Sequence, residues 1–357
     1  MQLQENIFSD SSLLNNGTVI VKLILYILIM LSSFVGNFLV LIAVYQNNNN
    51  RMRCPSNYFI VNVALCDLSM TLFNLLRAIV AIFTNDVWKI GGHLGLVLCA
   101  WCRLMWFVSI DVSIMSLLAV AVDRFLLIFF PTRKLISMKL ALVLIFSTWF
   151  IGVAFNIPPV LGTRLFELPN GLYCATKYEH VDYFRIYSFA HFAVFIVLPL
   201  IAMVGFYSAI AVNLRCHVTP GNPSAANQEL RNRHNRKILM LLVTLVSLFA
   251  LCWLPHWCGV LLCNYYNRCP PWPYHFVTII LVYSNSALNP CAYALFNESF
   301  RAEFKRIVKA YFYPTCLVLR RNQVIDINIQ LACAQSGRMM SVAAPTRTFS
   351  LSGVMNK

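Results

Sequence analysis

The sequence predicts an all-α membrane protein, a bundle of seven transmembrane helices followed by a short amphipathic helix on the inner leaflet. Hydrophobic residues make up 59% of the 357 residues and charged residues only 11%, whereas about a quarter of the residues in soluble domains are charged. The mean hydropathy is +0.68. A soluble chain of this length could not bury that much apolar surface. The apolar residues also gather in seven long runs, each near or above the ~20 residues that a spanning helix needs.

The seven runs comprise residues 19–45, 58–83, 94–130, 140–161, 186–214, 238–263 and 276–296. Such runs are predicted to be helices, because unsatisfied backbone amides are very costly in hydrocarbon. The chain then divides into an extracellular tail (1–18), a membrane domain (19–296), an amphipathic surface helix (297–313) and a disordered cytoplasmic tail (314–357). No internal repeat is evident, which argues against a transporter built from duplicated halves.

The basic residues predict the orientation in the membrane. The net charge of +15 is compatible with nucleic-acid binding, but the charge is concentrated in alternate connections, as the positive-inside rule describes. The connections after the first, third and fifth runs carry it, and so does the tail. We therefore predict a multi-pass plasma-membrane protein with an extracellular N-terminus and a cytoplasmic C-terminus. The sequon Asn16-Gly17-Thr18 would then allow glycosylation at Asn16.

Two connecting segments have patterns of their own. The segment 162–185 is amphipathic and contains Pro169-Asn170-Gly171, a turn sequence that predicts a β-hairpin. Residues 298–312 alternate apolar and basic side chains, which predicts an amphipathic helix on the inner leaflet, and Cys316 beyond it is a candidate for palmitoylation. The Ser- and Thr-rich tail is predicted to be disordered, and its phosphorylation would recruit a desensitising partner.

The third run is the one around which the chain is organised. It begins near Cys99 and ends near Asp123-Arg124-Phe125. At ~1.5 Å rise per residue, Cys99 and Arg124 would lie about 37 Å apart, enough for a tilted helix to cross the ~30 Å bilayer core. This helix is therefore predicted to couple a site outside the membrane to one inside.

Polar side chains inside membrane helices are functional candidates because burying them is costly. Asn37, Asp67 and Ser113 lie in the first three runs, and Asn285, Ser286 and Asn289 in the seventh. The alternative is interhelical hydrogen bonding, worth under ~2 kcal/mol each. An ionisable Asp67 accompanied by so many oxygen atoms favours a small-cation or proton site instead.

Several short motifs occur in order, one in each expected helix. They are Gly36-Asn37, Ala64-Leu65-Cys66-Asp67, Asp123-Arg124-Phe125, Trp149, Pro199 with Tyr207, Cys252-Trp253-Leu254-Pro255 and Asn289-Pro290-Cys291-Ala292-Tyr293. With them the chain resembles a rhodopsin-like (class A) G-protein-coupled receptor over about residues 19–312. Pro158-Pro159, Asn297–Arg301 and the hairpin segment resemble the neuropeptide-receptor branch of that family.

The resemblance assigns roles to particular residues. It implies a sodium pocket formed by Asp67, Ser113, Asn285, Ser286 and Asn289, with Asp67 and Ser113 as metal ligands, and no other cofactor. It implies an activation switch made of Ile114, Asp123, Arg124, Pro199, Tyr207, Phe249, Trp253, Pro255, Asn289, Pro290 and Tyr293. In that switch Asp123 holds Arg124 at rest, and release of Arg124 toward the G protein exchanges one partner for another.

The chain departs from the family pattern at Asn235, where many relatives place an acid that pairs with the arginine. A weaker resting lock should give measurable signalling without ligand. The resemblance also implies a disulfide between Cys99 and Cys174. Whether Cys263 and Cys269 form a second bridge remains open at this point.

The ligand pocket implied by the resemblance is lined by Arg77, Arg103, Trp106, Phe107, Asp111, His191, Trp253, His256, Trp257 and Tyr283. Trp106 stands where amine receptors have an aspartate, and Tyr283 where light-sensing members have a lysine, so neither a monoamine nor retinal is expected. Arg77 and Arg103 could pair with a carboxylate or with peptide carbonyls, or instead snorkel to the headgroups. Asp111 is expected to pair with His191 or to receive a ligand cation.

The sequence thus predicts a receptor for an extracellular ligand, with a neuropeptide favoured and a small non-amine ligand as the alternative. Its predicted partners are that ligand, a heterotrimeric G protein, arrestin, receptor kinases and membrane lipid, but not nucleic acid. A multi-pass transporter is the rival class. An enzyme is disfavoured because no His-Glu-x-x-His or Gly-x-Ser-x-Gly spacing occurs.

Overall fold

The computed structural model describes residues 16–46, 52, 54–131, 135–177, 181–216, 225–266 and 268–312. In this part of the chain, seven helices are long and apolar enough to cross a membrane. Six of the predicted runs agree with their helices to within five residues, whereas the helix of the sixth run, Ala225–Tyr266, begins 13 residues before the predicted run. Residues up to Phe304 form one compact unit and residues from Lys305 form another, and the packing below concerns the first unit. Cys316, the tail serines and threonines and most of the N-terminal tail lie outside the described residues.

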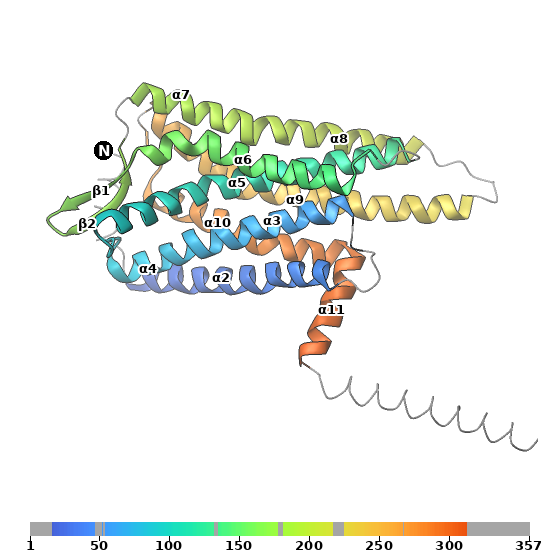
Figure 1. Cartoon of the computed structure of the whole chain (residues 1–357), viewed down its shortest axis with the longest axis horizontal. Helices are drawn as coiled ribbons and strands as arrows, with labels where there is room; N and C mark the ends of the chain where they lie inside the picture. Colours follow the sequence, from blue (N-terminus) through green and yellow to red (C-terminus); the bar gives the residue numbers. More distant parts are fainter. Residues whose placement is uncertain are drawn as a thin grey trace, which may run out of the picture. The chain divides into compact units, whose positions relative to one another are not determined.

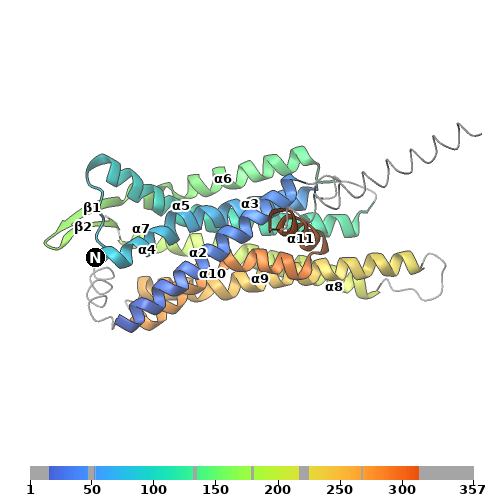
Figure 2. The same ribbon diagram turned by 90° about the horizontal axis from the view of Figure 1, so that it is seen from below.

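Each membrane span is one helix or a series of helical segments that follow each other directly (Figures 1 and 2). The spans are, in order, α2 (Asn16–Tyr45); α3 (Pro55–Met70) with π-helical η1 (Thr71–Leu75) and α4 (Leu76–Thr84); α5 (Gly92–Phe129); α6 (Met138–Leu161); α7 (Val181–His191) with π-helical η2 (Phe192–Val197) and α8 (Leu198–Cys216); α9 (Ala225–Tyr266); and α10 (Trp272–Phe296).

Local sequence explains several helix ends. Pro55 opens α3, where its fixed φ suits the first helical position and its missing N–H costs nothing. Ser137 caps α6 by accepting a hydrogen bond from the Leu140 amide at 3.2 Å. At the other end of the second span, Asn85 ends α4 in the left-handed conformation, with φ 50° and ψ 48°, a role that asparagine fills better than most residues.

The third span, α5, lies at the centre of the helical bundle. It packs against α3, α6, α8 and α9 and against the strand β1 (Thr163–Leu168). Its inward face is fully buried, and Val108, Val112 and Ile114 are all 0% exposed. Cys99 lies near the start of α5 and Arg124 near its end, about 37 Å apart by helical rise. We call the end of the bundle near Cys99 the hairpin end and the opposite end the Arg124 end.

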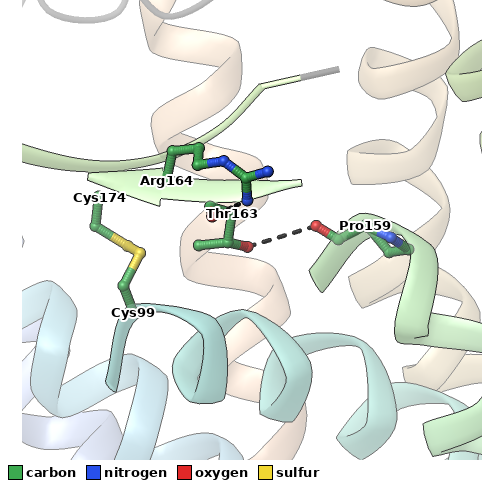
Figure 3. Close-up of a disulfide and its surroundings, with 5 residues drawn as sticks. All are labelled: Cys99, Pro159, Thr163, Arg164 and Cys174. Atoms are coloured by element: carbon green, nitrogen blue, oxygen red, sulfur yellow. Dashed lines mark hydrogen bonds between the residues drawn. A yellow bond between two sulfur atoms is a disulfide. The ribbon is translucent and has the colours of Figure 1, made fainter. Parts of the chain in front are cut away.

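The predicted β-hairpin is present between α6 and α7. Strand β1 pairs antiparallel with β2 (Gly171–Thr176), and Leu165 lies opposite Cys174. Gly171 adopts φ +138°, which residues with a side chain rarely adopt. Figure 3 shows how the hairpin is attached: Cys174 forms a disulfide with Cys99, and the Thr163 hydroxyl donates to the Pro159 carbonyl at 3.4 Å. The disulfide implied by the family resemblance is therefore formed.

The helix predicted after the seventh span is present as α11 (Glu298–Phe312). Its first turn is anchored by Phe300, which is 0% exposed and stacks on Tyr293 with ring centroids 5.5 Å apart. Apolar and basic residues alternate along it. Its position on a membrane leaflet remains a prediction.

Candidate functional site

A small cavity beside Asp67 contains most of the residues predicted to form the sodium pocket. Its volume is about 10 Å³, close to the space that one water molecule needs. It is lined by Cys66, Asp67, Met70, Ser109, Ile110, Ser113, Trp253, Asn285 and Ser286. The remaining predicted residue, Asn289, donates from Nδ2 to the Asp67 Oδ2 at 2.9 Å. The structure therefore brings together side chains from α3, α5, α9 and α10.

Several oxygen atoms around this cavity are buried without a partner. Within the described residues, the Oγ atoms of Ser109 and Ser113 and the Oδ1 of Asn285 accept or donate no hydrogen bond. One carboxylate surrounded by neutral oxygen atoms is the donor set that hard cations prefer. The residues present therefore fit a small cation.

Other buried polar residues join helices to one another. Asn37 donates to the Ser286 carbonyl at 2.9 Å and so joins the first and seventh spans. The Trp149 indole donates to Asn62 at 2.8 Å, and Asn62 donates to Ser116 at the same distance. For Asn37 the structure thus matches the alternative of interhelical hydrogen bonding.

The predicted ligand residues of α5, α9 and α10 meet in one aromatic cluster. Trp106 contacts Trp253, His256 and Tyr283, with centroid separations of 6.0, 5.9 and 5.8 Å. The Tyr283 hydroxyl donates to the Asn74 carbonyl at 3.2 Å, which fixes its ring. Because Trp253 also lines the Asp67 cavity, this cluster links the predicted ligand residues to the predicted sodium pocket.

Basic side chains surround the hairpin end of the bundle. Arg77 is exposed and lies over the Trp88 ring, 5.9 Å from its centroid. Arg103 is half-buried on α5. Lys22, which the sequence analysis did not single out, lies over Tyr26 at 5.7 Å, and Tyr26 contacts Tyr283. A lysine near the start of the first apolar run was the available signal.

Asp111 pairs with His191, as the sequence analysis proposed. The His191 Nε2 is 3.0 Å from Asp111 Oδ1, and both side chains are 0% exposed. Two further partners were missed. Asn156 of α6 donates to Asp111 at 2.6 Å, and the Tyr187 hydroxyl donates to Asn156 at 2.6 Å. A lone asparagine in the otherwise apolar fourth run was the signal that could have identified this contact.

At the Arg124 end, the expected pair between Asp123 and Arg124 is not formed. The Asp123 carboxylate instead accepts a hydrogen bond from Ser56. Across the described ranges, Arg124 forms neither a hydrogen bond nor an ion pair. The hydroxyl groups of Tyr207 and Tyr293 are buried and also have no partner there. Arg124, which was expected to exchange Asp123 for the two tyrosines, is therefore paired with none of them in this conformation.

The remaining residues of the predicted switch lie inside the bundle. Ile114 and Phe249 are buried, at 0% and 1% exposure, and Pro199 is buried as well. Phe249 contacts Trp253 with centroids 6.1 Å apart. Pro255 and Pro290 lie inside α9 and α10. A Cβ on Gly36 would come within 2.7 Å of the Pro290 side chain, so only glycine allows this approach of α2 to α10.

The structure also shows a second disulfide and an ion pair between helices that the resemblance did not imply. Cys263 is joined to Cys269, which settles in the structure the pairing that the sequence left open. Lys237 of α9 forms an ion pair with Glu298 at the start of α11, with 2.5 Å between Nζ and Oε1. Both side chains are about half exposed.

Comparisons with known proteins agree with this geometry. The family model described as "7 transmembrane receptor (rhodopsin family)" matches residues 36–293. The RYamide receptor of Drosophila melanogaster is 30% identical over 300 residues, covering 81% of this chain and 63% of that receptor. The RYamide receptor of Tribolium castaneum is 26% identical over 332 residues (87% and 85%). The neuromedin-K receptor of Homo sapiens is 25% identical over 346 residues (93% and 70%).

The family match includes part or all of each of the seven spans and contains every residue of the Asp67 cavity and of the switch described above. The chain therefore belongs to the rhodopsin family of seven-transmembrane receptors.

Proposed function

We propose that this chain is a peptide-activated receptor that signals through a heterotrimeric G protein. The observation that carries the proposal is the contact of Trp106 with Trp253, which places the ring expected to meet a ligand directly against the ring that lines the Asp67 cavity. The hairpin is joined to Cys99 by a disulfide, and we propose that it covers the ligand pocket as a lid. The similar receptors are named for RYamide and neuromedin K, which supports a peptide over a small non-amine ligand.

The proposed orientation follows from charge. The basic connections follow the first, third and fifth spans, and the third span ends near Arg124. The Cys99–Cys174 disulfide lies at the hairpin end, so this end is proposed to face the oxidising extracellular side. We test the topology with Asn16→Gln, which should abolish a glycosidase-sensitive mass shift of the expressed chain. A shift that persists in this variant would contradict glycosylation at Asn16.

The function is tested with a panel of RYamide, neuromedin K and substance P on cells that express the chain with a promiscuous G-protein reporter. We expect a saturable response to at least one peptide and none in cells without the chain. A response only to small molecules would favour the alternative ligand class. Ion flux without agonist-dependent nucleotide exchange would favour the transporter.

Arg77 is proposed to contact a carboxylate or backbone carbonyls of the ligand through its guanidinium. Its cation–π contact with Trp88 holds the group at the hairpin end without neutralising it. We expect Arg77→Gln to raise the half-maximal peptide concentration about tenfold, the effect of losing one charge-assisted hydrogen bond. Arg77→Lys should recover part of the loss. Equal potency of Arg77→Gln and wild type would refute the role.

Asp67 and the neighbouring oxygens of Ser113, Asn285 and Ser286 are proposed to hold a sodium ion. A bound ion would supply a counter-charge to the buried carboxylate and favour the conformation in which the cavity exists. We expect ligand-free nucleotide exchange to rise about threefold when sodium is replaced by N-methylglucamine at equal ionic strength. Asp67→Asn should remove this dependence, whereas the nearby control Ser69→Ala should retain it. Equal sodium dependence in both variants would exclude Asp67.

The pair between Lys237 and Glu298 is proposed to restrain the Arg124 end of α9, where Asn235 provides no acid. Exposed pairs are worth less than about 1 kcal/mol, so we expect Glu298→Gln to raise ligand-free signalling no more than about fivefold. The exchanged variant Lys237→Glu/Glu298→Lys should return it toward wild type. If the exchanged variant signals like Glu298→Gln, the pair has no restraining role.

A further inference from the structure

Four buried polar side chains form a hydrogen-bonded group inside the bundle, which we call the Asp111 cluster: Asp111, Asn156, Tyr187 and His191. The His191 Nε2 lies 3.0 and 3.2 Å from the two Asp111 carboxylate oxygens. Asn156 donates to Asp111 and accepts from the Tyr187 hydroxyl, both at 2.6 Å. The side chains of Asp111, Asn156 and His191 are 0% exposed. The cluster joins α5, α6 and α7 at one point.

Because its side chain is a carboxylate, Asp111 restricts how the three helices can be placed at this junction. A carboxylate inside a membrane helix is costly unless it is paired and hydrogen-bonded. Asp111 does not line the Asp67 cavity, and within the described residues its side-chain partners are His191 and Asn156. Removing one partner would leave a buried group uncompensated, and the relative positions of the three spans are therefore tied to one another.

His191 lies where the fifth span changes its helical geometry. It is the last residue of α7, and the next residues, Phe192–Val197, form η2. π-helical turns are rare, and they are found frequently at functional sites. The His191 ring stacks on Phe195 within η2, with centroids 5.2 Å apart, and on Trp257 of α9 at 5.0 Å. The contacts of His191 thus hold the π-helical segment against the third and sixth spans.

The cluster contains two of the predicted ligand residues, Asp111 and His191, and it also contacts Phe107 on one side and approaches the switch on the other. Phe107, one turn before Asp111 on α5, contacts the His191 ring at 5.6 Å. In the other direction, Asp111 precedes Ser113, which lines the Asp67 cavity, and η2 ends two residues before Pro199. A displacement of the His191 ring would therefore change the packing of Phe107 on one side and of the segment before Pro199 on the other.

We infer that Asp111 and His191 are positioning residues that restrain the fifth span in the signalling-inactive conformation, and that a ligand group displacing Phe107 or Trp257 releases this restraint. The inference rests on the proposed receptor function. The Asp111 cluster does not contact the G protein. It shifts the balance between two conformations, because the paired arrangement exists in only one of them.

Two variants remove the charged interaction between Asp111 and His191 while keeping a side chain of similar size at each position. Asp111→Asn keeps the shape and removes the charge, and His191→Phe keeps the stacked ring and removes the polar atoms. The matched control is Thr278→Val, which deletes a hydroxyl whose hydrogen bond, within the described residues, goes to the His275 carbonyl of its own helix at 3.0 Å. The full chain is studied in nanodiscs, by amide hydrogen exchange of residues 192–197 and by ligand-free nucleotide exchange on an added G protein.

We expect both variants to speed amide exchange in residues 192–197 at least about fivefold and to raise ligand-free nucleotide exchange per receptor about three- to tenfold. Thr278→Val should change neither. The double variant Asp111→Leu/His191→Phe, which removes the charge and its partner together, should be expressed at least as well as the single variants and keep the raised signalling. These results would support the inference.

Unchanged or reduced signalling in folded Asp111→Asn and His191→Phe would overturn it, as would a double variant that signals like wild type, because the cluster would then serve folding alone. If the wild-type chain activates no G protein, the proposed function fails. The restraint is then decided by amide exchange: acceleration confined to residues 192–197 supports it, and unchanged exchange overturns it.

Discussion

A chain carrying Arg124→Ala should reach the cell surface in normal amounts and yet signal at less than about a tenth of the wild-type level. Arg124 forms no hydrogen bond or ion pair with any residue that the structure describes, so the resting fold loses little when it is removed. In the proposed switch, active signalling uses new charge-assisted contacts of the guanidinium, each worth about 1.5–3 kcal/mol. Losing one of them lowers the signal about tenfold or more.

The measurement is agonist-stimulated nucleotide exchange divided by surface receptor number. Arg124→Lys is the matched variant, since it keeps the charge but cannot reproduce the planar fork of donors, and it should signal between Arg124→Ala and wild type. Asp123→Asn is a further control. The Asp123 carboxylate accepts a hydrogen bond from Ser56 and does not pair with Arg124, so this substitution leaves the arginine itself in place. A strong response from Arg124→Ala would mean that the coupling to the G protein uses other residues.

Loss of the disulfide between Cys99 and Cys174 should be the most destabilising single change. The bridge closes a loop with a sequence separation of 75 residues, and the chain-entropy argument assigns it about 4 kcal/mol. The Cys263–Cys269 bridge spans a separation of only 6, for which the same argument gives about 2 kcal/mol. Cys174→Ser should therefore lower surface expression and thermal stability more than Cys269→Ser.

The comparison uses the midpoint of thermal unfolding of detergent-solubilised chain, together with peptide potency. Cys174→Ser should also weaken the peptide response, because the hairpin is held to α5 by this bond (Figure 3). The double variant Cys99→Ser/Cys174→Ser serves as control and should resemble Cys174→Ser, which excludes an effect of the unpaired thiol. Equal stability of Cys174→Ser and Cys269→Ser would contradict the argument from loop length.

Features set by local sequence were predictable. The seven spans follow from runs of apolar residues, and the hairpin from Pro169-Asn170-Gly171, because both depend on a short stretch of chain. The grouping of Asp67 with Ser113 and Asn285 also agreed, since the family resemblance supplied the order of the helices in space. The exact residues at which helices begin and end were less accurate, differing by up to five positions for most spans and by 13 at the start of α9.

Contacts between helices were harder to predict. The partners Ser56, Asn156 and Tyr187 were missed because a polar residue in an apolar run does not reveal which neighbouring helix it faces. The pair between Asp123 and Arg124 was expected by analogy and is replaced by Ser56. The π-helical segments were not predicted either. The feature that accompanies η2 is the packing of Phe195 against His191, and this contact has no local sequence signal.

The two π-helical turns affect how this chain is compared with its relatives. A π turn accommodates one more residue than an α turn, and each residue of a helix advances the side-chain direction by about 100°. Against a relative whose second or fifth span is regular, a gapless alignment would therefore place Arg77, or Tyr187 and His191, on the wrong face. Docking based on such a relative therefore requires a one-residue insertion within Thr71–Leu75 or within Phe192–Val197 of this chain.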